Sequence, residues 1–175
     1  MRQSVFDAAV ATHGTRVWTL SVYLLGDATE AEDVVQEVLI RLWRHGAEVR
    51  EGRLRSWLMR VTRNACIDAV RRRSQGVDGR RAGDSGSLGH IEIELPGPER
   101  LAQSAQLGDR IAAALARLRE PQKSVVVMRE IQGLSYREIA EVLEMPLNSV
   151  RVALHRGRAR LRLELEEVRD HVATA

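Results

Sequence analysis

The sequence contains a single cysteine, Cys66, and only three tryptophans, two tyrosines and one phenylalanine among its 175 residues. One cysteine cannot form an internal disulfide, and the five histidines do not combine with it at metal-ligand spacing, so disulfide scaffolds and structural zinc are excluded. Because Cys66 lacks the partners of a nucleophile, we predict neither an enzyme nor a bound cofactor. The chain has no run of about 18 apolar residues to span a bilayer, and it starts without the apolar stretch of a signal peptide. We therefore expect a cytoplasmic protein without membrane insertion.

The net charge of +3 conceals an uneven distribution along the chain. Residues 1–49 carry −3, 50–81 carry +7, 82–120 carry −2 and 121–175 carry +1. Within the last segment, residues 147–162 hold five arginines and no acid. All cations except Lys123 are arginine, which suits bidentate contacts to phosphates and bases, although the high arginine count also fits the codon usage of a GC-rich genome. The clustering predicts two basic patches separated by acidic stretches.

The middle of the chain has the composition of a linker. Residues 76–98 contain six of the thirteen glycines and two of the four prolines, without a helical apolar period. On both sides the apolar residues recur at helical spacing and no strand pattern is present. We therefore predict an all-α fold of two small helical domains, 1–75 and 106–175, joined by a flexible linker over 76–105.

The first lobe shows three helical stripes. Residues 26–27 interrupt the pattern after the first, and Thr29 with Glu32 is predicted to form a capping box at the start of the second helix. Residues 44–52 form a polar loop before the third helix, where Trp57 is assigned to the core. The predicted buried residues are Phe6, Val10, His13, Val17 and Leu20, then Val34, Val35, Val38, Leu39 and Leu42, and then Leu54, Trp57, Leu58, Val61 and Ala65.

The second lobe ends in the pattern of a helix-turn-helix. After a first stripe over 107–118, a helix is predicted to start at Pro121 and to end at Gly133. Ser135 and Glu138 can form a capping box for a short helix, and residues 144–146 break the pattern before the last helix. The packed stripe of that last helix is predicted to be Val150, Ala153, Leu154, Gly157 and Leu161. Wheel geometry places another set of side chains opposite this stripe, where they can enter a major groove. This set is Asn148, Ser149, Arg151, Val152, His155 and Arg156.

Three stretches of this sequence resemble a known family in the same order. Residues 27–43 and 54–73 are similar to conserved region two of sigma factors of the extracytoplasmic-function group, and 133–140 with 149–156 resemble region four. The resemblance implies a bacterial sigma subunit that joins core RNA polymerase, contacts its clamp coiled coil and flap, and directs it to promoter DNA. It also implies control by an anti-sigma factor.

Carried over by position, the resemblance assigns roles to three groups of residues. The polymerase-binding group is Asp33, Gln36, Glu37 and Arg41, which the residues alone would describe as a solvated acidic face. The group facing the minus-ten element is Arg60, Arg63, Asn64, Arg71 and Arg72. The set on the last helix faces the minus-thirty-five element. The alternative is a stand-alone helix-turn-helix regulator, which leaves the 33–43 motif unexplained.

Overall fold

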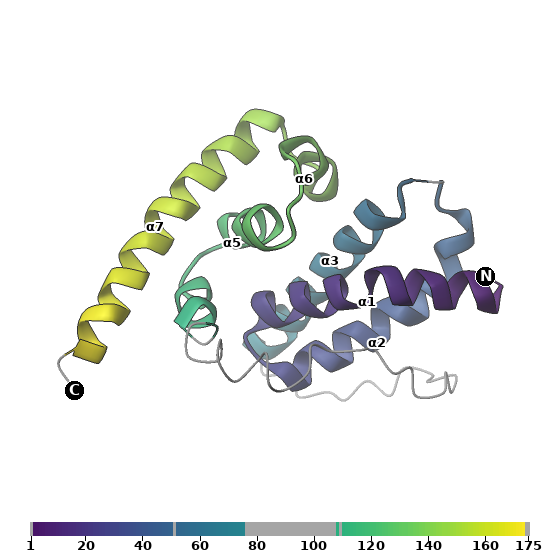
Figure 1. The fold of residues 1–175 in the computed structure, drawn as a ribbon, viewed down its shortest axis with the longest axis horizontal. Helices are drawn as coiled ribbons and strands as arrows, with labels where there is room; N and C mark the ends of the chain where they lie inside the picture. Colours follow the sequence, from purple (N-terminus) through teal and green to yellow (C-terminus); the bar gives the residue numbers. More distant parts are fainter. Residues whose placement is uncertain (1, 51, 76–107, 109, 174–175) are drawn as a thin grey trace. The chain divides into compact units, whose positions relative to one another are not determined.

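The computed structural model describes residues 2–50, 52–75, 108 and 110–173, with side chains up to residue 166 (Figure 1). These parts are helices, short helical turns and loops, and none of them is a strand, as the predicted all-α fold requires. They form two compact units: residues 2–21 with 27–75, and residues 22–26 with 108 and 110–173. The predicted linker over 76–105 lies outside the described residues, so the proposed domain boundaries stay predictions.

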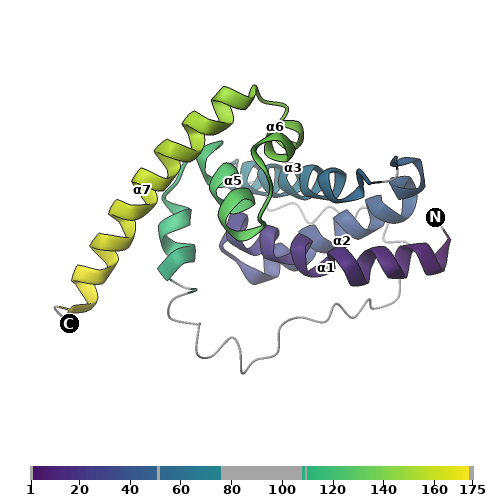
Figure 2. The same cartoon turned by 45° about the horizontal axis from the view of Figure 1, so that its top comes forward.

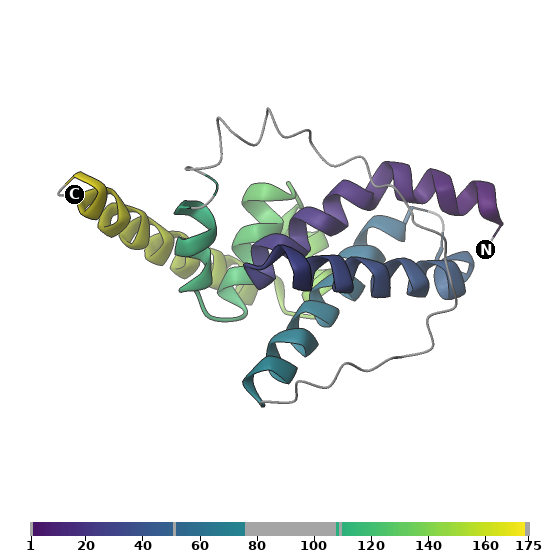
Figure 3. The same cartoon turned by 90° about the horizontal axis from the view of Figure 1, so that it is seen from below.

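The first unit contains three helices, the first of which continues into the second unit with its last four residues, 22–25. α1 (Gln3–Leu25) and α2 (Ala28–His45) run side by side in opposite directions, as Figures 1 and 3 show, and the turn η1 (Gly46–Glu48) leads toward α3 (Leu54–Ser74). The predicted stripe of α2 is entirely buried, from Val34 to Leu42. Phe6 of α1 is 2% exposed and meets the ring of Trp43 edge-on at a centroid distance of 5.2 Å. The predicted core of these two helices is therefore present, apart from His13, which is half-buried.

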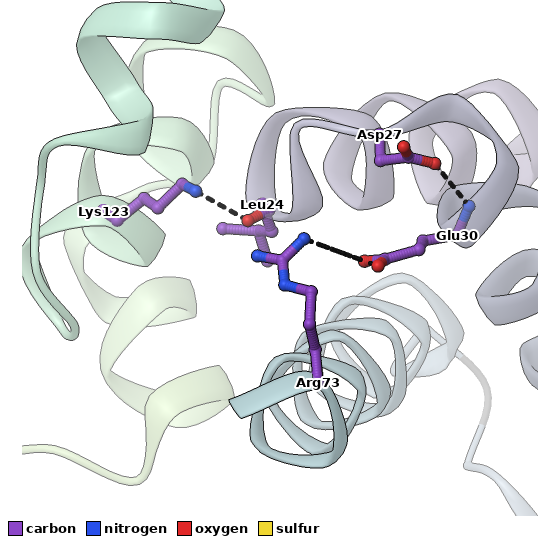
Figure 4. Close-up of polar contacts among 5 residues, drawn as sticks. All are labelled: Leu24, Asp27, Glu30, Arg73 and Lys123. Carbon is purple, nitrogen blue, oxygen red and sulfur yellow. Dashed lines mark hydrogen bonds and ion pairs between the residues drawn. The ribbon is translucent and has the colours of Figure 1, made fainter. Parts of the chain in front are cut away.

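The predicted capping box at the start of α2 was wrong. The N-cap is Asp27, whose side chain accepts a hydrogen bond from the Glu30 backbone N–H at 2.9 Å, and Thr29 lies inside the first turn (Figure 4). Gly26, at φ +73°, reverses the chain immediately before Asp27. Because Asp at the N-cap satisfies a free N–H and complements the helix dipole, the helix begins one residue before Thr29.

The buried face of α3 differs from the predicted one. The residues fully buried are Leu58, Met59, Thr62, Ala65 and Cys66, whereas Leu54, Trp57 and Val61 are half-buried. Thr62 can enter the core because its hydroxyl donates to the Leu58 carbonyl oxygen at 2.8 Å, which satisfies its hydrogen-bonding capacity inside the helix. The assignment of Trp57 to the core was therefore wrong in part, since one side of the indole remains accessible.

The second unit contains a helical segment over 110–116, α5 (Gln122–Val126), the π-helical turn η2 (Val127–Ile131), α6 (Tyr136–Leu143) and α7 (Leu147–Ala173). α5 follows Pro121 directly, and Gly133 ends the turn at φ +67°, both as predicted. The predicted capping box is confirmed: the Glu138 N–H donates to Ser135 Oγ at 3.2 Å, and the Ser135 N–H donates to Glu138 Oε2 at 2.7 Å. Lys123 Nζ donates to the Leu24 carbonyl oxygen at 2.6 Å within this unit (Figure 4).

The π-helical turn was not predicted. Residues 124–128 are five consecutive residues with exposures of 1% or less, and they span the end of α5 and the start of η2. Because side chains of successive helical residues are spread at 100° intervals, this run is covered on more than one side. The π turn then changes the directions of the residues that follow it.

α7 is one long helix that continues well past α6 (Figure 2). Its inward side carries Val150, Ala153, Leu154 and Gly157, all buried as predicted, while Leu161 is half-buried. Gly157 faces α5 so closely that a Cβ there would lie 2.6 Å from Val126 Cγ2. The first half of α7 is therefore packed against α5 and α6 along one side and leaves the other side open.

Candidate nucleic-acid and protein interfaces

The proposed polymerase-binding residues lie on the face of α2 opposite its buried stripe. Asp33 and Gln36 are exposed, and neither makes a hydrogen bond or ion pair with the described residues. Glu37 and Arg41, one turn apart, are half-buried and form an ion pair with each other. A pair of free polar groups beside a salt bridge gives this face both donors and acceptors for a protein partner.

The proposed minus-ten residues are only partly brought together. At 100° per residue, Arg60, Asn64 and Arg71 fall on one face of α3, whereas Arg63 and Arg72 point to opposite flanks of it. Asn64 is exposed, and its Oδ1 accepts from Arg63 Nη1 at 3.3 Å. The half-buried Trp57 lies on the same face as Asn64, seven residues earlier.

Two acids reduce the free positive charge at the end of α3. Arg71 lies 3.7 Å from Asp68 Oδ1, and Arg73 Nη1 lies 3.4 Å from the carboxylate of Glu30 on α2 (Figure 4). Because these pairs are exposed, their contribution to stability is small, and solvent or a polyanion can compete for the arginines. Arg72 is exposed as well, so the basic segment stays accessible.

The proposed minus-thirty-five residues all lie on the open side of α7. Asn148, Arg151, His155 and Arg156 are exposed, Val152 is 48% exposed, and Ser149 is half-buried. Arg151 Nη1 donates to Asn148 Oδ1 at 3.4 Å, a weak contact that a base or phosphate can replace. The short α6, the break at 144–146 and α7 follow one another in the order of a helix-turn-helix, a motif whose second helix enters a major groove.

Two arginines of the basic stretch on α7 are engaged in ion pairs within the second unit. Nε and Nη2 of Arg158 donate to Glu130 Oε1 at 2.9 and 2.6 Å. Arg160 pairs with the buried Glu164, which also accepts from Arg117 Nη1 at 2.7 Å. The hydrogen bond to Glu130 is the main cause that raises the pKa of the Arg158 guanidinium above its usual value. Helical spacing could not identify Glu130 as a partner, because Glu130 lies 28 residues before Arg158, whereas Glu164 lies only one turn after Arg160.

Neither a cluster of metal ligands nor a membrane-spanning helix occurs among the described residues. No group of three His, Cys, Asp or Glu side chains within the described ranges could hold a metal ion. Where helices are described, none is both long and apolar enough to cross a membrane. Cys66 is a buried free thiol on α3.

Comparison with known proteins gives two family matches. The model of Sigma-70 region 2 matches residues 9–75, and that of Sigma-70 region 4 matches residues 108–161. The chain is 36% identical over 157 residues to the ECF RNA polymerase sigma factor SigE of Mycolicibacterium smegmatis. This alignment covers 90% of the chain and 60% of the length of SigE. This chain is also 30% identical over 171 residues to the ECF RNA polymerase sigma factor SigW of Bacillus subtilis. That second alignment covers 95% of the chain and 91% of the length of SigW.

A solved structure supports the same fold. The sigma factor RpoE of Bartonella quintana, crystallised with the anti-sigma factor NepR, matches with a TM-score of 0.71 at 22% identity, over 92% of this chain and 96% of RpoE. The two matched regions occur in the order that the sequence motifs predicted, and together they account for most of the chain. The chain therefore belongs to the extracytoplasmic-function group of the sigma-70 family of RNA polymerase sigma factors.

Proposed function

We propose that this chain is an alternative sigma factor that binds core RNA polymerase through its first unit and directs it to promoters with both units. The observation that carries the proposal is the pairing of region 2 and region 4 in one chain, each with an open polar or basic helix face. A stand-alone regulator needs only the recognition helix and gives the exposed residues of α2 no role. Because promoters lie on the chromosome, a protein with this function acts in the cytoplasm.

In this proposal the open face of α2 docks on the clamp coiled coil of the polymerase. Asp33 and Gln36 supply unpaired polar groups, and the Glu37–Arg41 pair supplies a charged edge. The second unit contacts the flap. We also propose control by an anti-sigma factor, because the similar RpoE was crystallised with one.

On promoter DNA, the cationic face of α3 meets the separated strands of the minus-ten element. Arg60 and Arg71 attract the phosphate backbone, and Asn64 between them offers an amide to a base edge. The open side of α7 enters the major groove at the minus-thirty-five element. There Arg151 can read guanine, Asn148 can read adenine, and Val152 can contact a thymine methyl.

Polymerase docking is tested by co-purification of the full chain with core RNA polymerase. Gln36→Ala with Arg41→Ala should weaken the complex and leave the helical content unchanged, because both residues lie off the buried stripe. Glu32→Ala, exposed near the start of the same helix, is the matched surface control. Leu39→Ala should instead cost about 2–5 kcal/mol of folding stability, because Leu39 is 5% exposed. Undiminished co-purification of the double variant would remove the docking assignment.

Promoter recognition is tested by runoff transcription from genomic fragments with the reconstituted holoenzyme. If Arg151 reads a base, Arg151→Ala should cost about 1–3 kcal/mol on a recovered promoter and much less when the minus-thirty-five segment is scrambled. If Arg156 meets phosphate, Arg156→Ala should weaken all sequences alike and reduce the salt slope by about one contact. Promoter binding by the chain without polymerase, at full specificity, would favour the stand-alone regulator instead.

A further inference from the structure

α7 packs on α5 and α6 with the buried side of its first half. α7 and α5 are in close contact at Gly157, where a Cβ would meet Val126 Cγ2 at 2.6 Å and the Gln122 carbonyl oxygen at 3.4 Å. Apolar packing of this kind favours a crossing angle but allows a scatter of about 15–20° around it. A directional contact near this point can therefore narrow the angle of α7.

Arg158, the next residue along α7, makes such a contact. Its Nε and Nη2 converge on one carboxylate oxygen of Glu130, which belongs to η2. The side chains of Arg158 and Glu130 are 50% and 43% exposed, so the pair adds little to the free energy of unfolding. Two donors that share one acceptor nevertheless define a direction, and rotation of α7 would break at least one of these hydrogen bonds.

The same π-helical turn holds the start of α6. Arg129, beside Glu130, donates to the Leu134 carbonyl oxygen at 2.8 Å, and its guanidinium lies 5.0 Å from the ring centroid of Tyr136, the first residue of α6. Adjacent residues of η2 therefore contact different helices of the helix-turn-helix. Glu130 contacts α7, and Arg129 contacts the loop and the first turn of α6.

We propose that Glu130 and Arg158, supported by Arg129, are positioning residues that set the orientation of α7 and thereby the base preference of its open face. This inference rests on the proposed minus-thirty-five role of α7. Six residues separate Arg151 from Gly157, which is about 9 Å along a helix. A rotation of about 10° around Gly157 displaces Arg151 by about 1.5 Å, which is enough to lose a hydrogen bond to a base edge. Contacts to phosphates tolerate such a displacement better, because they depend on charge more than on direction.

The test uses holoenzyme reconstituted from the full chain and core RNA polymerase. Its template is a promoter recovered by the wild-type holoenzyme, with the minus-thirty-five segment randomised and read out by sequencing the transcripts. Glu130→Gln and Arg158→Gln should each reduce the preference for the favoured base about two- to fivefold, the range expected for one exposed ion pair. Selectivity at the minus-ten element and the salt slope should not change. Glu130→Arg combined with Arg158→Glu should recover most of the lost preference.

Two further variants separate positioning from charge and from stability. Arg119→Gln removes an exposed arginine of the second unit that lies outside α7, and it should leave the base preference unchanged. Leu115→Ala, at a residue 1% exposed in the segment 110–116, should lower the melting temperature of the second unit without changing the preference. Unchanged preference in Glu130→Gln and Arg158→Gln, or equal loss in Leu115→Ala, would overturn the inference while the proposed function stood. A wild-type holoenzyme with no preference in the randomised segment would overturn the proposed function and this inference together.

Discussion

Replacement of Gly157 by alanine tests the helix crossing on which the second unit depends. The added Cβ would lie 2.6 Å from Val126 Cγ2, at least about 1 Å closer than a favourable carbon–carbon contact. Val126 is 1% exposed and its β-branched side chain is held in one rotamer on α5, so Cγ2 cannot swing aside. The helices must therefore move apart around Gly157.

Two effects of opposite sign decide the size of the change. Alanine favours a helix interior over glycine by about 1 kcal/mol, and overpacking of a tight core costs about 1–3 kcal/mol. Because the clash involves a buried side chain rather than a flexible surface group, we expect the overpacking cost to dominate. The net loss in the free energy of unfolding of the second unit should be about 1 kcal/mol.

The assay uses the distribution of tryptophans between the two units. Trp18, Trp43 and Trp57 all belong to the first unit, so their fluorescence reports its unfolding in urea, whereas far-ultraviolet circular dichroism reports both units. Gly157→Ala should shift the dichroism transition to lower urea and leave the fluorescence transition unchanged. Val126→Ala removes both γ carbons, including the Cγ2 that clashes. The double variant should therefore be more stable, by about 1 kcal/mol of unfolding free energy, than the sum of the two single losses predicts. Stabilisation by Gly157→Ala alone would show that helix propensity dominates and that α5 and α7 do not cross as closely as described.

Two other perturbations test local features. Burial lowers the pKa of His13, and the nearby Arg16 of α1 and Arg55 of α3 lower it further. The folded first unit therefore binds fewer protons at this site than the unfolded chain does. Its stability should fall as the pH drops below about 6.5 toward the pKa of His13 in the folded state. His13→Gln should abolish this loss in fluorescence-monitored urea unfolding, whereas His155→Gln should not. Glu144 ends α6 at φ +53°, a conformation that disfavours β-branched residues most. Glu144→Val should therefore lower the free energy of unfolding by about 1 kcal/mol relative to Glu144→Gly, and equal stability of the two variants would contradict a left-handed residue there.

The fold was predictable where a single short-range interaction determines the local structure. The apolar stripe of α2 and the capping box at Ser135 follow from spacing and short-range hydrogen bonds, and both are present. The start of α2 was predicted wrongly, because Asp27 was interpreted only as part of the interruption, although Asp is a stronger N-cap than Thr and here follows a chain-reversing glycine. The π-helical turn could not be predicted, because an apolar run in the sequence does not distinguish π from α hydrogen bonding.

The open faces of the candidate sites were predicted better than the partners of their charges. The outward residues of α7 follow from helical periodicity once the inward stripe from Val150 to Gly157 is recognised. The same periodicity misplaced Trp57, because it treated Thr62 as polar, although its hydroxyl is satisfied within α3. Sequence spacing also gives no information on Glu130, which meets Arg158 only after the chain has turned through α6.

This pairing changes what the basic stretch of α7 can contribute to binding DNA. Five arginines over 147–162 suggest up to five phosphate contacts, each of which adds about 0.9 to the salt slope of duplex binding. Arg160 pairs with Glu164, whose carboxylate is only 1% exposed, so DNA cannot easily take the place of this carboxylate. The four other arginines set a ceiling of about 3.6 on the slope from this helix. Arg158 can reach a phosphate only by leaving its exposed pair with Glu130, which would give up the contact that ties α7 to η2. Where that contact is kept, three arginines remain for DNA, and the ceiling is about 2.7.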